Sequence, residues 1–342
     1  MAPTLPIRTA LIGLGNSGQF YHLPHLSERE RFDLRVVVAE HDESAGRIAQ
    51  LLGAEASTDW RSVVARSDIE LVVIALPHSL HHAVTLAALE HGKHVLVEKP
   101  MALTVAHADE MLDAARHSGT VLMVHHQRRW EADFVAILDS IRSGEIGDVW
   151  RVVVARSHQG RYRKASAHSP HDGAEMATWA EELERGGGIS QVVGPHPVDH
   201  LLTLADSAVA SVNAKVHYSD GDEVEDWIGI DVGFSSGVTG RVDVFRWSGI
   251  APPRFAVYGT KGTAVSESST EVNVKLHNGR NRRMSGLPVP GILGDEIYDD
   301  IFQAIRNGRD PRLTAFDARA VVEVLDMSRR SAESGGVLIS PP

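Results

Sequence analysis

The stretch RTALIGLGNSG, residues 8–18, decides the fold of the first half of the chain. An apolar strand over 9–12 leads into Gly13, Gly15 and Gly18, which have the G-x-G-x-x-G spacing, and the segment from 19 to about 29 can form a helix. Glycines at these positions permit a tight turn and let a pyrophosphate approach the backbone at a helix N-terminus. The pattern is weak alone, but a strand before it and a helix after it predict a dinucleotide-binding βαβ unit.

Strands and helices alternate through the rest of the first 125 residues. Strands are predicted over 33–40, 69–77, 94–100 and 121–130, and helices over 43–53, 79–92 and 105–119. Such alternation is typical of a doubly wound parallel sheet, whose ligands bind beyond the carboxyl ends of the strands. The predicted cofactor contacts at those ends are Gly13, Gly15, Asn16, Ser17, Gly18, Glu40, His41, Pro77, Glu98 and Lys99.

Glu40 lies at the end of the second predicted strand, 22 residues after Gly18. A carboxylate there can accept hydrogen bonds from the adenosine ribose hydroxyls. No arginine lies beside it to favour a 2′-phosphate, so NAD is predicted rather than NADP. The alternative interpretation is an ordinary βαβ unit that binds no ligand.

The net charge of −11 argues against nucleic acid as a partner, because nucleic-acid binding depends on a basic surface that neutralises phosphates. No apolar run is long enough for a membrane span. The absence of cysteine excludes disulfides, thiolate nucleophiles and Cys-ligated zinc. The N-terminus leads directly into a predicted strand, so we expect no cleavable signal and a cytoplasmic location.

Lys99 follows a buried strand in the sequence VLVEKP. Pro100 disfavours helical backbone at the lysine, so a stiff turn directs the side chain. An ammonium group at this strand end could bind a substrate hydroxyl, orient the nicotinamide and stabilise a forming alkoxide. The alternative is an ordinary surface lysine.

Four segments in this order resemble the Gfo/Idh/MocA family, which includes glucose–fructose oxidoreductase and inositol dehydrogenase: ALIGLGNSG, ALPHSLHH, GKHVLVEKPMAL and GGGISQVVGPHPVD. The turn YGTKGT, residues 258–263, is also similar. The resemblance covers essentially the whole chain. It implies an N-terminal Rossmann domain over 1–125 and a C-terminal α/β domain over 126–342 with an open, mainly antiparallel sheet. It also implies a nicotinamide cofactor and a sugar or cyclitol substrate.

The family resemblance assigns further positions one at a time. His81 matches a family histidine near the cofactor, whereas Leu76 and His78 replace a threonine and an asparagine. Val192 stands where the family has an aspartate, with Gln191 as its polar neighbour. Because valine cannot accept a proton, Lys99 and His196 must act without that carboxylate, or the chemistry differs.

From about residue 147 the chain shows period-two strands, typical of a sheet with one face free. Seven strands are predicted, over 148–158, 209–218, 225–234, 237–246, 254–260, 262–268 and 271–277. The free face suits pairing into a homodimer or homotetramer. A helix over about 312–335 is predicted to pack back on the first domain.

His196 lies between two prolines and precedes a predicted helix over 197–206. Pro197 suits the first turn, which leaves His196 at or beside the N-cap. The positive end of the helix dipole disfavours imidazolium, so a neutral His196 could accept a proton from a sugar hydroxyl. The alternative is a structural histidine.

The segment 158–188 is rich in His, Arg and Tyr and is suited to roof a substrate site. Its cationic and aromatic residues suit a polyol, particularly one with a carboxylate or sulfonate. Arg128 either contacts such a substrate or pairs with Glu98 or Asp133. The predicted substrate contacts are Gln127, Arg128, His158, Arg161, Tyr162, Arg163, Trp179, Gln191, Asp199 and His200.

Three histidine groups have spacings that could ligate zinc, but none is a full ligand set, so no metal is predicted. They are His78/His81/His82, His168/His171 and His196/His200. The leading hypothesis is an NAD-dependent oxidoreductase that acts on a secondary hydroxyl of a sugar, sugar acid or cyclitol through Lys99 and His196. Two alternatives are an NAD-dependent glycosidase that uses transient oxidation and elimination, and a non-catalytic dinucleotide-binding sensor.

Overall fold

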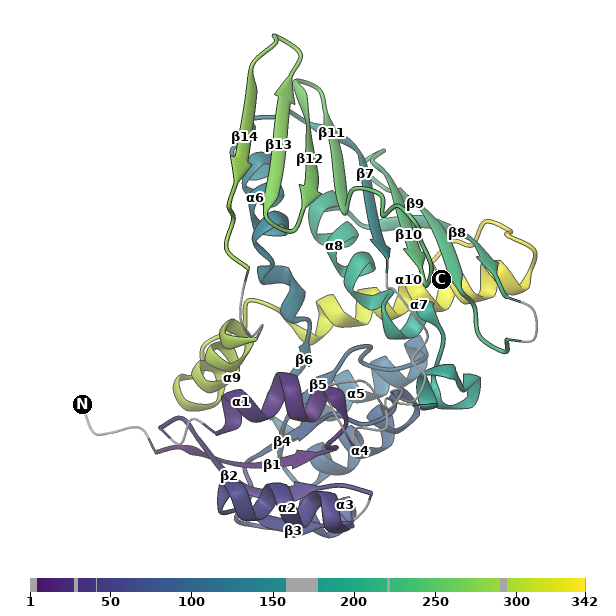
Figure 1. Ribbon diagram of the computed structural model, residues 1–342. Helices are drawn as coiled ribbons and strands as arrows, with labels where there is room; N and C mark the ends of the chain where they lie inside the picture. The colour runs from purple at the N-terminus through teal and green to yellow at the C-terminus, as the bar shows by residue number, and fades with distance from the viewer. Residues whose placement is uncertain are drawn as a thin grey trace. The chain divides into compact units, whose positions relative to one another are not determined.

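The computed structural model describes residues 5–27, 30–40, 42–157, 178–219, 222–289 and 294–341, which form two compact units. The first unit comprises the described parts of Met1–His126, Tyr162–Gly186 and Gly294–Arg319. The second comprises those of Gln127–Arg161, Gly187–Leu293 and Ala320–Pro342 (Figure 1). Each unit therefore collects segments that are far apart in the sequence.

The first unit contains a sheet of six parallel strands in the order β3-β2-β1-β4-β5-β6. The strands are β1 (Ile7–Ile12), β2 (Phe32–Val38), β3 (Glu55–Ser57), β4 (Leu71–Ile74), β5 (His94–Glu98) and β6 (Leu122–His125). The strand order reverses between β1 and β4, as in doubly wound dinucleotide-binding folds. The predicted Rossmann sheet is confirmed.

After β2, four α-helices of the first 126 residues connect the strands: α2 (Asp42–Leu52), α3 (Trp60–Val64), α4 (His78–Glu90) and α5 (Val105–Ser118). Gly53, Gly92 and Gly119 follow α2, α4 and α5 with φ of 66°, 68° and 66°. A positive φ of this size ends a helix, and glycine adopts it without a Cβ penalty. The predicted helix ends are therefore correct.

Several predicted elements of this unit are too long, among them the strand over 69–77, of which only β4 (Leu71–Ile74) forms. In place of a helix over 19–29, the structure has one π-helical turn, η1 (Gly18–His22), and one α-helical turn, α1 (Leu23–Leu26). Pro24 suits the first turn of α1 but cannot donate a hydrogen bond inside a longer helix. The predicted strand 121–130 ends at His125, and η2 (Gln127–Trp130) is a 3-10 helix.

Helix α9 (Asp295–Asn307) belongs to the first unit although it lies about 170 residues beyond β6. Its buried Tyr298 and Phe302 pack edge-on against Phe32 of β2, with ring centroids 5.4 and 6.1 Å apart. The unit also contains two short 3-10 helices, η3 (Thr178–Glu181) and η4 (Leu183–Arg185).

The second unit contains an eight-stranded sheet in the order β14-β13-β12-β11-β7-β10-β9-β8 (Figure 1). The strands are β7 (Val149–Ser157), β8 (Val209–His217), β9 (Trp227–Phe234), β10 (Thr239–Phe245), β11 (Phe255–Gly259), β12 (Gly262–Ser268), β13 (Glu271–Leu276) and β14 (Asn281–Ser285). Only the β7–β10 pairing is parallel among these strands. The mainly antiparallel sheet is confirmed, but the prediction of seven strands missed β14, whose sequence NRRMS has no apolar alternation.

Helices cover one face of this sheet. These are α6 (Ala132–Arg142), α7 (Ile189–Val192) and α8 (Pro195–Ala205). Ser266 of β12 donates to Asp133 of α6 at 2.8 Å, and Gly240 of β10 lies against Leu201 of α8. Alternate residues point to the other face, where Arg241 forms ion pairs with Asp231 and Asp243.

The last helix, α10 (Ala315–Glu333), is assigned to the first unit up to Arg319 and to the second unit from Ala320. Within the first unit, Arg319 donates to Asp109 of α5 at 2.9 Å. None of the helices that the structure describes is long and apolar enough to cross a membrane.

Candidate functional site

The glycine loop after β1 has the properties of a nucleotide-binding turn. Gly13 has a φ of +107°, and a Cβ atom there would lie 2.1 Å from the carbonyl oxygen of Ala75. A Cβ at Gly18 would lie 2.1 Å from the carbonyl oxygen of Gly13, whereas one at Gly15 would meet nothing within 4 Å. The first and third glycines are therefore required by packing, and Gly15 leaves open backbone that a pyrophosphate can approach.

Exposed polar groups surround this loop at the carboxyl edge of the sheet. Gly15 and Asn16 are exposed and Ser17 is half-buried. The loop is joined to β2 by a hydrogen bond from the Gly13 N–H to the carbonyl of Val38 at 2.9 Å, and the exposed Glu40 follows two residues later. His41 lies outside the described residues.

His78 and His81 occupy the first turn of α4, behind the end of β4, and both are buried. The Nδ1 atom of His78 bonds to the carbonyl of Gly186 at 2.7 Å, and its ring lies edge-on to Trp179 with centroids 4.5 Å apart. The two nitrogens of His81 bond to the carbonyls of Pro100 and Leu76, at 2.8 and 2.9 Å. His81 thus joins the end of β4 to the turn after Lys99, while burial lowers the pKa of both histidines.

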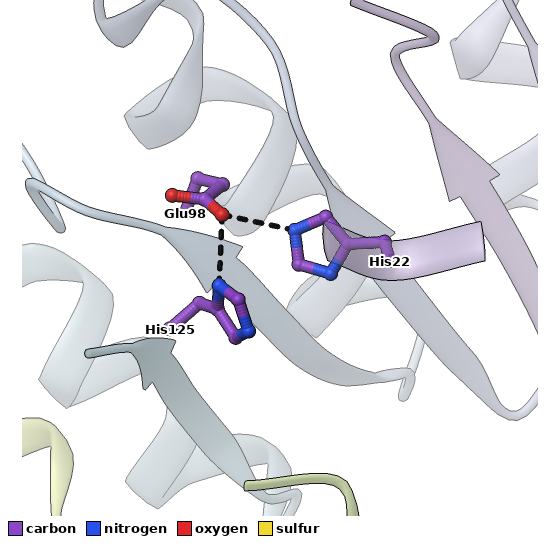
Figure 2. Close-up of side chains that lie close together, drawn as sticks. All are labelled: His22, Glu98 and His125. Carbon is purple, nitrogen blue, oxygen red and sulfur yellow. Dashed lines mark hydrogen bonds and ion pairs between the residues drawn. The ribbon is translucent and has the colours of Figure 1, made fainter. Parts of the chain in front are cut away.

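Glu98, the last residue of β5, is the centre of a buried polar cluster (Figure 2). Its Oε1 atom bonds to His125 Nδ1 at 2.8 Å and to His22 Nε2 at 3.1 Å. Its Oε2 atom accepts the backbone N–H of Lys99 at 3.2 Å. The second nitrogen of His22 bonds to the hydroxyl of Tyr298 at 2.8 Å. The carboxylate therefore connects the backbone of Lys99 to η1, β6 and α9.

The protonation states in this cluster follow from its partners. Burial by itself would raise the pKa of Glu98, but the charges and hydrogen bonds of His125 and His22 hold that pKa well below its usual range. Burial lowers the pKa of His22, and burial raises that of Tyr298 well above its ordinary value. At neutral pH an ionised Glu98 thus accepts the Nε2–H of His22, whose Nδ1 in turn accepts the Tyr298 O–H.

The ligand atoms of His22, Glu98 and His125 lie within 4.8 Å of one another, which is close enough to consider a metal ion. The hydrogen bonds just described already account for this geometry without an ion. Of the predicted histidine groups, His78 and His81 bind backbone carbonyls, whereas His82 pairs with Glu110 at 2.7 Å. His168 and His171 lie outside the described residues.

Glu98 and Lys99 are predictable from the sequence, but the groups that hold them were not predicted. His125 could have been found, because β5 and β6 are adjacent parallel strands and Glu98 is in register with His125. His22 and Tyr298 gave no such signal. His22 reaches the carboxylate from a short irregular helix, and Tyr298 bonds to His22 from a segment about 200 residues beyond Glu98.

In the second unit, His196 is buried in the first turn of α8. The predicted position at or beside the N-cap is wrong by about two residues, because α8 begins at Pro195 and its N-cap is Gly194. Proline is favoured at the first helical position, so the first of the two prolines starts the helix. His196 is therefore the second helical residue.

The glycine triplet before this helix is used for packing inside each unit. A Cβ at Gly186 would lie 2.7 Å from the Cβ of His78. Gly188, with a φ of 99°, makes room for Glu225, which accepts the N–H of Ser190 at 2.7 Å at the start of α7. Gln191, within α7, is half-buried.

Arg128 and the buried Gln127 lie in η2. Arg128 pairs with Glu131 at 2.5 Å, so the predicted pairing with Glu98 or Asp133 is wrong. Glu131 also binds Arg254 and Arg156. Burial by itself would raise the pKa of Glu131, but the three arginines lower it to about 2.

Asp199 and His200 of α8 are buried among partners of the second unit. Arg129 binds both carboxylate oxygens of Asp199 at 2.6 to 3.1 Å. His200 stacks on Phe134 with centroids 4.3 Å apart, and its Nε2 bonds to a backbone carbonyl. Burial lowers the pKa of His200 to about 3, so it is neutral at physiological pH. The remaining predicted contacts, His158, Arg161, Tyr162 and Arg163, lie outside the described residues.

Comparison with known proteins identifies the two halves of the chain. Residues 7–126 match the oxidoreductase family with an NAD-binding Rossmann fold, and residues 134–265 match the GFO/IDH/MocA C-terminal domain. A 1,5-anhydro-D-fructose reductase of Ensifer adhaerens is 34% identical over 266 residues, which cover 76% of each chain. The NADP(+)-dependent scyllo-inositol 2-dehydrogenase of Bacillus subtilis is 24% identical and covers 96% of this chain and 94% of its own.

A solved structure has the same fold. Levoglucosan dehydrogenase, in complex with NADH and levoglucosan, superposes with a TM-score of 0.82 at 24% sequence identity. The superposition covers 98% of this chain and 100% of the other.

Proposed function

Because the chain belongs to the Gfo/Idh/MocA family of oxidoreductases, we propose that it transfers hydride between NAD and a secondary alcohol carbon of a sugar, sugar acid or cyclitol. The observation that carries this proposal is the end of β5, where the buried carboxylate of Glu98 holds the backbone of Lys99. The relatives named above act on ring-shaped polyols and their ketones, which supports the substrate class.

The glycine loop supports a dinucleotide on the first unit, and Glu40 supports the choice of NAD. When bound, NAD supplies the nicotinamide carbon that accepts or donates hydride. Gly13, Asn16, Ser17 and Gly18 would place backbone around the pyrophosphate, with Gly15 as the point of closest approach. The Glu40 carboxylate would accept the ribose hydroxyls, and its negative charge would repel the 2′-phosphate of NADP.

We assign the proton chemistry to Lys99 and His196. The Lys99 ammonium would bind the substrate oxygen and stabilise negative charge as the hydroxyl proton leaves. The His196 imidazole would accept that proton during oxidation and return it during reduction. Val192 supplies no carboxylate, so these two nitrogens must perform the proton transfer.

The two domains would divide this work, with residues 1–125 for NAD and residues 126–342 for substrate and for self-association. The face of the second sheet opposite α6 and α8 supports a homodimer or homotetramer, because its Arg241 and Asp231 are half-buried or exposed in the single chain. The mass of the particle by light scattering, before and after Arg241→Glu, tests this assembly. A particle of one chain in the unchanged protein would contradict it.

A cofactor-reduction assay tests the proposed reaction. NADH formation is measured at 340 nm with a panel of sugars, sugar acids and inositols, for the wild type and for Lys99→Ala. We expect the substitution to lower turnover at least about 100-fold while NAD binding stays within a few-fold, because the amine acts on the substrate oxygen. Lys275→Ala, at an exposed position of β13, is the control.

Two other outcomes would replace the proposal. Release of aglycone from a chromogenic glycoside that requires NAD but forms no net NADH would indicate a glycosidase. NAD binding without either activity across the panel would indicate a sensor. Full activity of Lys99→Ala would remove the catalytic assignment of Lys99.

A further inference from the structure

Two imidazole–carboxylate pairs face each other in the first unit, one buried and one at the surface. In the buried pair, Glu98 accepts from Nδ1 of His125 at 2.8 Å, and the exposed fractions of the two residues are 4% and 0%. In the outer pair, Nδ1 of His25 lies 3.0 Å from Oδ1 of Asp295. The His25 side chain is 6% exposed and that of Asp295 is 78% exposed, so the outer pair reaches solvent.

Gly294 lies between the two imidazoles. A Cβ atom at this position would lie 3.1 Å from Nε2 of His125 and 3.1 Å from Nε2 of His25. The two nitrogens are therefore at most about 6 Å apart, a separation that one bridging water can span. The residue is glycine with a φ of +129°, so no side chain separates the rings.

The tautomer of His125 decides which of its ring nitrogens donates a proton and which accepts one. Because Nδ1 must donate to the Glu98 carboxylate, a neutral His125 carries its proton there and presents a lone pair at Nε2. That Nε2 atom is buried and has no hydrogen-bond partner among the described residues. A buried acceptor without a partner is costly, so its presence beside a second imidazole calls for a functional explanation.

We propose that Asp295, His25, His125 and Glu98 form a proton path between solvent and the end of β5, which exchanges the proton of the substrate hydroxyl through Lys99. This role rests on the proposed oxidoreductase function. His22 and Tyr298 are positioning residues in it. His22 donates to Glu98, and Tyr298 bonds to His22 and stacks on His25 with ring centroids 4.6 Å apart.

The proton balance is simplest in the direction of ketone reduction. NADH, when bound, would supply the hydride for the C–H bond, and the Lys99 ammonium gives a proton to the substrate oxygen and becomes a neutral amine. His25 acts here as an imidazolium, with one proton on Nδ1 facing the Asp295 carboxylate and one on Nε2. It releases the Nε2 proton to Nε2 of His125, and water beside the exposed Asp295 then returns one proton to His25. His125 then passes its Nδ1 proton to Glu98. This carboxyl group, which already accepts the Lys99 backbone N–H, would return a proton to the amine of the same residue. Oxidation runs the same transfers in reverse, so one proton enters or leaves for each hydride and no other reactant is needed.

The first test measures proton exchange without any substrate. Nitrogen-15 NMR of histidine-labelled protein reports how fast the Nδ1–H of His125 and the Nε2–H of His22 exchange with water. The two protons are equally buried and share one acceptor atom, but only His125 faces the path, so His22 is an internal reference. We expect His125 to exchange at least about tenfold faster than His22 in the wild type.

The variant His25→Phe keeps the ring that stacks on Tyr298 and removes the proton carrier. We expect it to bring the His125 exchange rate down to that of His22, whereas His82→Phe, a change at an exposed ion pair with Glu110, leaves the ratio unchanged. Asp295→Asn changes an exposed side chain and should reduce the ratio in the same direction if His25→Phe fails to fold. Equal rates in the wild type, a ratio unaffected by these variants, or an Nε2–H tautomer of His125 would overturn the path.

The second test links the path to catalysis. With a substrate found in the panel, His25→Phe should lower kcat at least about tenfold with KM unchanged within about twofold, and imidazole in the buffer should restore part of kcat. A purely structural defect would not respond to imidazole. Slowed exchange in a protein without turnover would refute the oxidoreductase function but keep the path. Turnover that His25→Phe leaves unchanged would refute the catalytic role of the path.

Discussion

His200→Phe distinguishes a neutral core histidine from a substrate-binding one, and its effect on stability can be worked out from the structure. The side chain is fully buried between aromatic rings, and burial lowers its pKa from 6.5 to about 3. The unfolded chain therefore binds a proton as pH falls below about 6.5, while the native protein does not until about pH 3. Stability from a neutral His200 is thus lost progressively as pH falls through this window.

The size of the effect follows from the same two pKa values. At pH 5 the protonation of His200 in the unfolded chain lowers the free energy of unfolding by about 2 kcal/mol, because each pKa unit is worth about 1.4 kcal/mol. At pH 7 this contribution of His200 protonation is close to zero. The substitution to phenylalanine should then lower the free energy of unfolding by about 1 kcal/mol, because the hydrogen bond to the Arg128 carbonyl is lost. We therefore expect the variant to be less stable than the wild type at pH 7 and more stable by about 1 kcal/mol at pH 5.

Urea unfolding followed by circular dichroism at the two pH values measures this crossover. His277→Phe, at an exposed turn after β13, is the matched control and should show no crossover. Equal differences between wild type and His200→Phe at both pH values would show that His200 does not titrate as a buried group. In that case its assignment to the core would be wrong.

Four further predictions concern the nucleotide site and the cluster behind Lys99. Gly15→Ala should fold normally but bind NAD at least about tenfold more weakly by calorimetry, because its methyl group fills the space open to the pyrophosphate. Gly13→Ala should instead destabilise the fold itself by several kcal/mol in urea unfolding, since the methyl would meet the Ala75 carbonyl, and normal stability would contradict that packing. Glu40→Ala should weaken NAD binding about tenfold or more and strengthen NADP binding, because the carboxylate that accepts the ribose hydroxyls also repels the 2′-phosphate; an unaltered preference in cofactor titrations would refute the ribose contact. Glu98→Gln should lower the free energy of unfolding at pH 7 by about 3 kcal/mol, because one amide oxygen cannot replace a carboxylate that accepts three N–H groups. The loss should persist down to about pH 5, since the depressed pKa of Glu98 keeps it ionised there. A difference below the error of urea unfolding would refute the network.

Much of the fold was predictable because it depends on local sequence patterns of glycine spacing and hydrophobic period. The spacing of Gly13, Gly15 and Gly18 and the alternation of strands with glycine-terminated helices predicted the first sheet, and period-two segments predicted seven strands of the second. Elements without such patterns were missed. β14 is polar throughout, and β3 and α3 are too short to show a period.

The candidate site was predictable only in part, and the division has a physical cause. The sequence by itself determined which segments form the parallel strands, because strand direction and hydrophobic period are properties of neighbouring residues. It thereby placed Glu40, Glu98 and Lys99 near the carboxyl ends, although the strands stop two to five residues earlier than predicted. Only the tertiary structure decided what those residues touch. The position of η1 brings His22 to Glu98, α9 brings Tyr298 to His22, and packing buries His200 away from water. Contacts between distant segments depend on how whole elements pack, which no short stretch of sequence encodes.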